Sequence, residues 1–187
     1  MKINWISCTV VIMYLSLIAK NTTFAQEATF DKQVLRSQLP IPQEENQLFY
    51  LQRDPDSNTI IYTLNLKNGH LDTSKPVKAY WIRYAENGQR KNLSLLQENM
   101  AYGVQTKQTK TGYTMHIKAY KALSIYLVKD PNKNTYSAEV EINNNRVQLE
   151  HLFVRIKGGS FFHPNIDYIE ITGKAQNGVS VQQRIKP

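Results

Sequence analysis

From residue 47 onward, apolar and polar side chains alternate in short runs that are rich in Tyr, Ile, Val and Thr. In residues 58–67, Ile60, Tyr62 and Leu64 fall on one face of an extended chain, and Ile61 and Thr63 fall on the other. This alternation predicts β-strands with one face in a core. Further strands are predicted at residues 77–84, 102–107, 113–120, 123–129, 135–142, 146–156, 166–172 and 179–185.

Turn-forming residues divide these runs, so the connections are expected to be short. Asn68-Gly69 and Asn87-Gly88 supply residues that tolerate positive φ. Only residues 92–100 predict a helix, with apolar residues three and four positions apart and Asn92 placed to cap it. Nine or ten strands with hairpin-length links predict an all-β, mainly antiparallel fold, either a sandwich or a barrel with one short helix. A parallel βαβ fold would need crossover helices that the sequence does not predict.

The first 25 residues have the layout of a cleavable signal peptide. Lys2 precedes an apolar stretch at residues 3–18, and a polar region ending in Thr23-Phe24-Ala25 predicts cleavage after Ala25. Residues 26–45 are polar and are expected to form an extended lead-in, with residues 46–187 as a single β domain. We therefore expect an exported protein of the periplasm or cell envelope, with no transmembrane segment after cleavage.

Composition limits the chemistry that the exported chain can perform. Cys8 is the only cysteine and lies in the signal peptide, so cysteine nucleophiles, disulfides and thiolate metal sites are excluded from the mature chain. Cleavage removes Lys2 and Lys20 and no acid, which leaves 21 basic and 15 acidic residues and a net charge of about +6. In an exported protein this excess favours anionic lipid, polysaccharide or small-molecule partners rather than nucleic acid.

No cofactor or metal site is predicted. His70, His116, His151 and His163 are dispersed, and none has the spacing of a metal-binding motif. Residues 158–163 hold Gly158-Gly159-Ser160 and His163, which partly resemble a nucleophile elbow but lack its second glycine and its α/β context. Ser160 and His163 form an alternative candidate site, although paired glycines more simply indicate a tight turn.

Two arginines emerge from apolar strands and suggest a ligand site. Arg83 follows Trp81 at a spacing of two and precedes Tyr84, and Arg155 follows Phe153 in the same way. If these strand faces converge, aromatic walls with two guanidinium groups would suit a carboxylate or phosphate on an apolar ligand. The simpler explanation is that the arginines pair with carboxylates such as Glu139, Glu141 or Glu170, or that both side chains extend into solvent, because a strand surface often carries such residues. The predicted contacts are Trp81, Arg83, Tyr84 and Arg155.

Several stretches together are similar to one bacterial family. They are residues 46–53 (NQLFYLQR), 58–62 (NTIIY), 77–85 around Tyr80-Trp81-Ile82-Arg83-Tyr84, 101–103 (AYG) and 155–168 with Gly158-Gly159-Ser160-Phe161. In combination they resemble the family called domain of unknown function 4833, over roughly residues 42–173. The resemblance implies an uncharacterised exported protein of the Bacteroidetes kind, and it implies no activity, cofactor or site residue.

Three functions are compatible with these patterns. The first is an envelope or periplasmic module that binds an anionic or amphipathic ligand. The second is a hydrolase of envelope material that uses the loop at residues 158–163, with Ser160 or His163 as the reactive group. The third is a structural protein that contributes an exposed strand edge to an assembly. A non-enzymatic function is favoured, and the sequence leaves the oligomeric state open.

Overall fold

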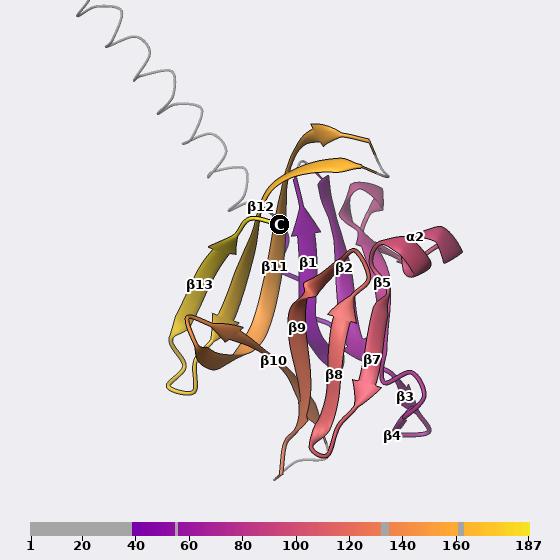
Figure 1. The fold of residues 1–187 in the computed structure, drawn as a ribbon. Helices are drawn as coiled ribbons and strands as arrows, with labels where there is room; N and C mark the ends of the chain where they lie inside the picture. Colours follow the sequence, from indigo (N-terminus) through magenta and orange to yellow (C-terminus); the bar gives the residue numbers. More distant parts are fainter. Residues whose placement is uncertain (1–38, 55, 132–134, 161–162) are drawn as a thin grey trace, which may run out of the picture. The chain divides into compact units, whose positions relative to one another are not determined.

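The computed structural model describes residues 39–54, 56–131, 135–160 and 163–187. The predicted signal peptide and most of the predicted lead-in lie outside these residues, as do Phe161 and Phe162. Residues from Ile41 to Pro187 form one compact unit, and strands make up nearly all of its secondary structure (Figure 1).

Eleven strands form one mixed sheet, and two short strands form a separate hairpin. The large sheet consists of β1 (Gln47–Arg53), β2 (Asp56–Leu64), β5 (Val77–Arg83), β6 (Gln89–Asn92), β7 (Val104–Gln108), β8 (Gly112–Ile117), β9 (Tyr120–Lys129), β10 (Tyr136–Ile142), β11 (Asn145–Gly159), β12 (Pro164–Lys174) and β13 (Ser180–Ile185). The hairpin consists of β3 (Leu66–Lys67) and β4 (His70–Leu71). A 3-10 turn, η1 (Tyr84–Glu86), follows β5, and α2 (Leu95–Met100) follows β6.

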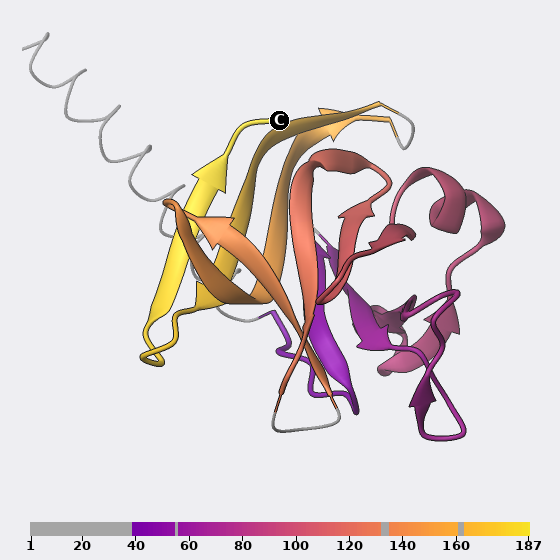
Figure 2. The same cartoon turned by 60° about the horizontal axis from the view of Figure 1, so that its bottom comes forward.

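The long strand β11 is the branch point of the sheet. Its first residues pair with β10, and residues 151–154 pair with β1, while β12 accompanies it along most of its length. Two arms therefore leave β11, one with the order β1-β2-β5-β6 and one with the order β10-β9-β8-β7. The sheet curls so that the arms face each other in a half-barrel (Figure 2).

The hydrophobic core fills the space between the two arms. Phe49 and Tyr62 stack at a centroid distance of 4.4 Å in the first arm, and Met115 and Ile125 are fully buried in the second. Alternation explains this placement, because each strand turns every second side chain inward. The core therefore forms from residues that lie far apart in the sequence.

The predicted all-β fold is confirmed, and the structure adds details that the pattern did not predict. The pairing of β1 with β11 is parallel, with Tyr50 opposite His151. The predicted helix is shorter: Ser94 caps it with a capping box, whereas the predicted cap, Asn92, is the last residue of β6. Local polar signals of similar strength at Asn92 and Ser94 explain the wrong boundary. In the part of the chain that the structure describes, no helix is long and apolar enough to span a membrane.

Candidate functional site

An arginine lies against two aromatic rings where β1 ends. Arg53 is the last residue of β1, and its guanidinium carbon lies 5.7 Å from the ring centroid of Trp81 and 5.9 Å from that of Tyr102. The two rings meet edge to face, with centroids 5.2 Å apart. This geometry is that of a cation–π contact on a preformed aromatic corner. It joins the first arm to the segment that precedes β7.

Two hydrogen bonds fix the aromatic corner. The Tyr62 hydroxyl donates to the backbone oxygen of Tyr102 at 2.9 Å, and the Trp81 indole N–H donates to Gln97 Oε1 in α2 at 3.3 Å. Burial raises the pKa of the Tyr102 hydroxyl, and nearby Arg53 opposes that shift. Trp81 and Tyr102 are therefore held in place by other parts of the unit.

Arg83 lies on the same sheet face as Trp81, at the end of β5. Its guanidinium pairs with Glu86 at 2.5 Å. Arg53 is paired more loosely, since Asp56 Oδ2 lies 3.6 Å from its Nη2, which is longer than a hydrogen bond. The Nε–H groups of Arg53 and Arg83 are both buried and have no hydrogen-bond partner among the described residues. We call Arg53, Trp81, Arg83 and Tyr102 the arginine–aromatic cluster.

The other two predicted contacts lie on the opposite face of the sheet. Val154 pairs with Arg53 and packs against the core, so the next residue, Arg155, points away from it, where it forms an ion pair with Asp54. Tyr84 begins the turn η1 and lies near Glu44, which also accepts a hydrogen bond from the outward-facing Tyr80. Burial together with the charge of Glu44 raises the pKa of the Tyr84 hydroxyl. The structure thus places Trp81 and Arg83 on one face of β5 and places Tyr84 and Arg155 on the other side of the sheet.

The alternative site at residues 158–163 has the geometry of a turn. Ser160 Oγ accepts a hydrogen bond from the backbone N–H of His163, and the Ser160 N–H donates to the His163 backbone oxygen, both at 3.1 Å. Gly159 has φ +89°, and a Cβ there would lie 2.3 Å from the His163 oxygen, so a glycine is required. Among the described residues, no general base is hydrogen-bonded to Ser160 Oγ.

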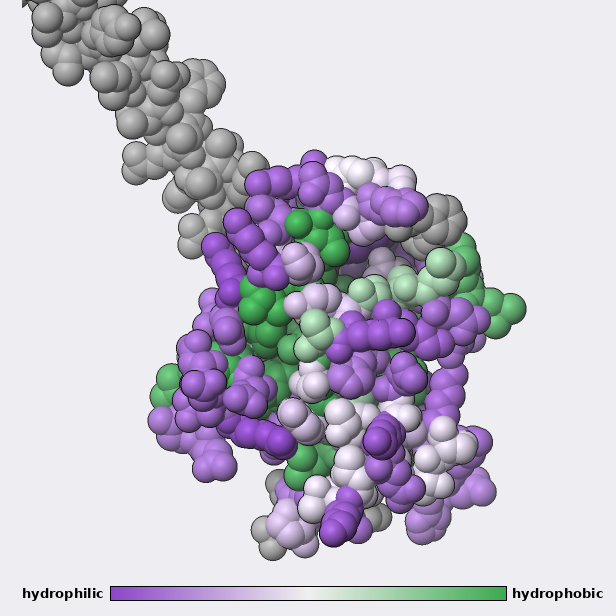
Figure 3. Space-filling view, viewed as in Figure 1, coloured by the Kyte–Doolittle hydropathy of each residue, from purple (hydrophilic) through white to green (hydrophobic). Residues whose placement is uncertain are grey.

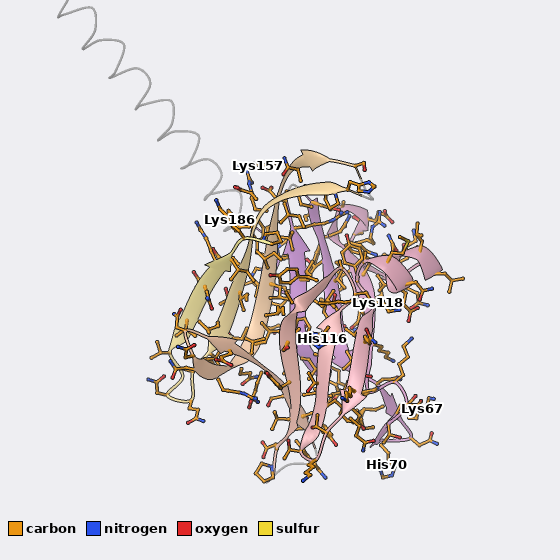
Figure 4. All side chains as sticks on the ribbon, in the orientation of Figure 1. Lys67, His70, His116, Lys118, Lys157 and Lys186 are labelled. Atoms are coloured by element: carbon orange, nitrogen blue, oxygen red, sulfur yellow. The ribbon has the colours of Figure 1, made fainter. Side chains whose placement is uncertain are left out.

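The histidines remain dispersed in space. Figure 4 shows His70 on the β3–β4 hairpin and His116 on β8, well separated. The His116 ring bonds the Leu123 backbone oxygen at 3.1 Å, and His151 stacks on Tyr50. In residues 39–54, 56–131, 135–160 and 163–187, no group of three or more His, Cys, Asp or Glu side chains is placed to hold a metal ion.

Comparison with known proteins gives one informative match. The model of a family described as domain of unknown function (DUF4833) matches residues 49–184. The chain belongs to the DUF4833 family. No curated protein and no solved structure matches it. The matched span contains every residue of the arginine–aromatic cluster, so the cluster belongs to the DUF4833 domain itself.

Sequence reasoning missed Arg53 and Tyr102 of this DUF4833 protein. A signal for Arg53 was present, because Phe49, Leu51 and Arg53 alternate as Trp81 and Arg83 do. What the sequence could not supply was the order of the strands, which places β1 two strands from β5 and brings Tyr102 across from the other arm. The alternation of side chains along a strand shows which residues share a face of that strand, but it does not show which strands lie next to each other in the sheet.

Proposed function

We propose that this DUF4833 protein is an exported envelope protein that binds an anionic, amphipathic ligand at the arginine–aromatic cluster. The observation that carries the proposal is the pair of buried Nε–H donors on Arg53 and Arg83, which have no acceptor among the described residues. A buried donor without a partner is unfavourable by about 1–3 kcal/mol, so such groups usually meet an acceptor in the functional state. An oxyanion is the acceptor that a guanidinium matches best.

The surroundings of the two guanidinium groups favour a ligand that is partly apolar. The Arg53 and Arg83 side chains are about 30% exposed, which leaves each accessible from outside. Trp81 is almost fully buried beneath Arg53, whereas Tyr102 is only half-buried. A carboxylate or phosphate could replace Asp56 or Glu86 on an arginine while its apolar part packs on the aromatic ring.

Export rests on the sequence. The signal-peptide layout of residues 1–25 and the net positive charge of the mature chain support a periplasmic or envelope location in a bacterium of the Bacteroidetes kind. The ligand would then be an envelope lipid, a lipid fragment or another acidic amphiphile.

Edge-strand assembly has less support, because β6, β7 and β13 each carry Lys or Arg, which discourages pairing with another chain.

The form that begins at Gln26 has Trp81 as its only tryptophan, so its fluorescence reports on the cluster. We would titrate this form with dodecanoate and, separately, with dodecyl maltoside as an uncharged amphiphile. A saturable change in emission is expected with dodecanoate alone. Arg53→Ala/Arg83→Ala should weaken it by at least about tenfold, since each charge-assisted hydrogen bond contributes roughly 1.5–3 kcal/mol.

The matched control is Arg146→Ala. Arg146 also lies over an aromatic ring, 3.6 Å from the Tyr126 centroid, but far from the cluster on β11. It should bind dodecanoate as the wild type does. Equal binding by the double variant, or an equal response to dodecyl maltoside, would show that the two guanidinium groups do not form the site.

A further inference from the structure

The helix α2 is inverted relative to an ordinary surface helix. Its apolar residues Leu95, Leu96 and Met100 are 79%, 44% and 59% exposed, and none of its residues is buried. Its contacts with the rest of the unit come instead from polar residues: Gln97 accepts the Trp81 indole N–H, and Glu98 pairs at 2.6 Å with Lys75 in the loop before β5. A surface helix normally turns its apolar stripe to the core.

The three apolar side chains form one patch. At 100° per residue they fall within an arc of about 140° of the helix, which also contains the polar Asn99. Figure 3 shows hydrophobic surface at α2, on the right of the view. Single exposed apolar residues are common, but half of the large exposed hydrophobics of the described residues lie on this six-residue helix.

Lysines border the patch. The turn between β8 and β9 is hydrogen-bonded to the end of α2, with the Ala119 N–H donating to the Ala101 oxygen at 3.0 Å. This contact brings Lys118 to the α2 side, where its Nζ bonds Asn99 Oδ1 at 3.1 Å (Figure 4). Lys118 and Lys121 line a hollow of about 450 Å³ together with Asn99, Val104 and Gln105.

The local charge is one-sided. Residues 99–129 contain no Asp or Glu, and of their five lysines Lys118 and Lys121 lie at the turn beside α2, whereas Lys107, Lys110 and Lys129 lie at the other end of these strands. Glu98 is the one acid of α2, and Lys75 neutralises its charge. The hydrogen bond from Lys75 lowers the pKa of the Glu98 carboxyl, so the two side chains remain an ion pair. An apolar patch with a basic border matches the two features of an anionic bilayer, an acyl interior and negatively charged head groups.

We infer that α2 and the β8–β9 turn dock this protein onto the surface of an anionic phospholipid bilayer. Leu95, Leu96 and Met100 would enter the head-group region, and Lys118 and Lys121 would contact lipid phosphates. The surface is distinct from the arginine–aromatic cluster, although Gln97 bonds Trp81 and so places the two next to each other. Docking would present the cluster close to a source of anionic amphiphiles.

The test is co-sedimentation of the form that begins at Gln26, which contains the whole compact unit, with vesicles of phosphatidylglycerol and phosphatidylethanolamine or of phosphatidylcholine. Binding is expected with the anionic vesicles and should fall by at least about tenfold in Leu95→Ser/Met100→Ser, because apolar burial is lost. Lys118→Gln/Lys121→Gln should lower it by roughly fivefold for each lysine. Circular dichroism and Trp81 emission verify that the variants are folded.

The matched control is Val179→Ser, which removes an apolar side chain of 55% exposure on the turn between β12 and β13. It should pellet as the wild type does. Absence of wild-type binding, or unchanged binding in the α2 variant, would overturn the inference. Dimerisation that disappears in Leu95→Ser/Met100→Ser without vesicle binding would also overturn it, by showing that a second copy covers the patch. The dodecanoate titration should be unchanged in the α2 variant, so failure here is separable from failure of the ligand site.

Discussion

The hydroxyl of Tyr62 connects the two arms at the scale of a single residue. It is fully buried, and it donates to the Tyr102 backbone oxygen 40 residues away. Burial raises the pKa of this hydroxyl, so it stays a donor across the physiological range. We expect Tyr62→Phe to lower the free energy of unfolding by about 1–2 kcal/mol in urea titrations, because the carbonyl loses its partner. The control is Tyr126→Phe, at a hydroxyl with no hydrogen bond among the described residues, which should change the free energy of unfolding by less than about 0.5 kcal/mol. Equal losses in the two variants would contradict a stabilising role for the Tyr62 hydrogen bond.

Two of the four residues of the arginine–aromatic cluster could be predicted from the sequence. Trp81 and Arg83 could be placed on one face from their spacing alone, whereas Arg53 comes from a strand whose neighbours the sequence does not specify. Arg155 looked equivalent to Arg83, since each follows an aromatic residue by two positions. The difference arises from inward and outward faces: Trp81 belongs to the core cluster and Phe153 does not. Burial of a face depends on which strands cover it, and this is a tertiary property.

At the scale of elements, the β3–β4 hairpin is held by one carboxylate. Asp72 receives hydrogen bonds from Lys67 and Ser74 at 2.6 Å, and these lower its pKa well below the usual value. A lowered pKa in the folded state means that the stabilisation is present above about pH 4 and is lost as the pH falls below it. The protection factors of the His70 and Asp72 amides, which are the intrinsic exchange rate at each pH divided by the observed rate, should therefore fall between pH 5 and pH 3. Asp72→Asn should show low protection factors at both values, and wild-type protection factors that do not change with pH would refute the assignment.

Element types were predictable where the signal is local. Asn68, Gly69, Asn87 and Gly88 all adopt positive φ, as expected for turn residues. The start of the helix was harder to predict, because two possible capping residues, Asn92 and Ser94, lie close together. The strand β6 was missed because Gln89, Arg90, Lys91 and Asn92 are all exposed and show no apolar alternation. Edge strands of this kind are set by their partner, here β5, rather than by their own sequence.

At the scale of the whole molecule, the sheet depends on contacts between distant parts of the chain. Tyr50 of β1 pairs with His151 of β11, and only when both arms reach β11 can they enclose the core. No periodicity in the sequence encodes this pairing. The all-β fold class could therefore be predicted, whereas the order of the strands in the sheet could not. Such non-local pairing makes folding slow, in the range of milliseconds to seconds.

The branch at β11 should therefore be formed in the folding transition state. Leu152 is 2% exposed and sits between Leu51 of β1 and Ile171 of β12. We expect Leu152→Ala to reduce stability by about 2–5 kcal/mol, with more than half of the loss in the folding rate. Stopped-flow emission of Trp81 measures this, since its ring contacts Tyr102 of the opposite arm. Ile185→Ala, in the terminal strand β13, should act mainly on the unfolding rate, because that strand can join after β11 has closed the core. A Leu152→Ala variant that only unfolds faster would place the nucleus within one arm instead.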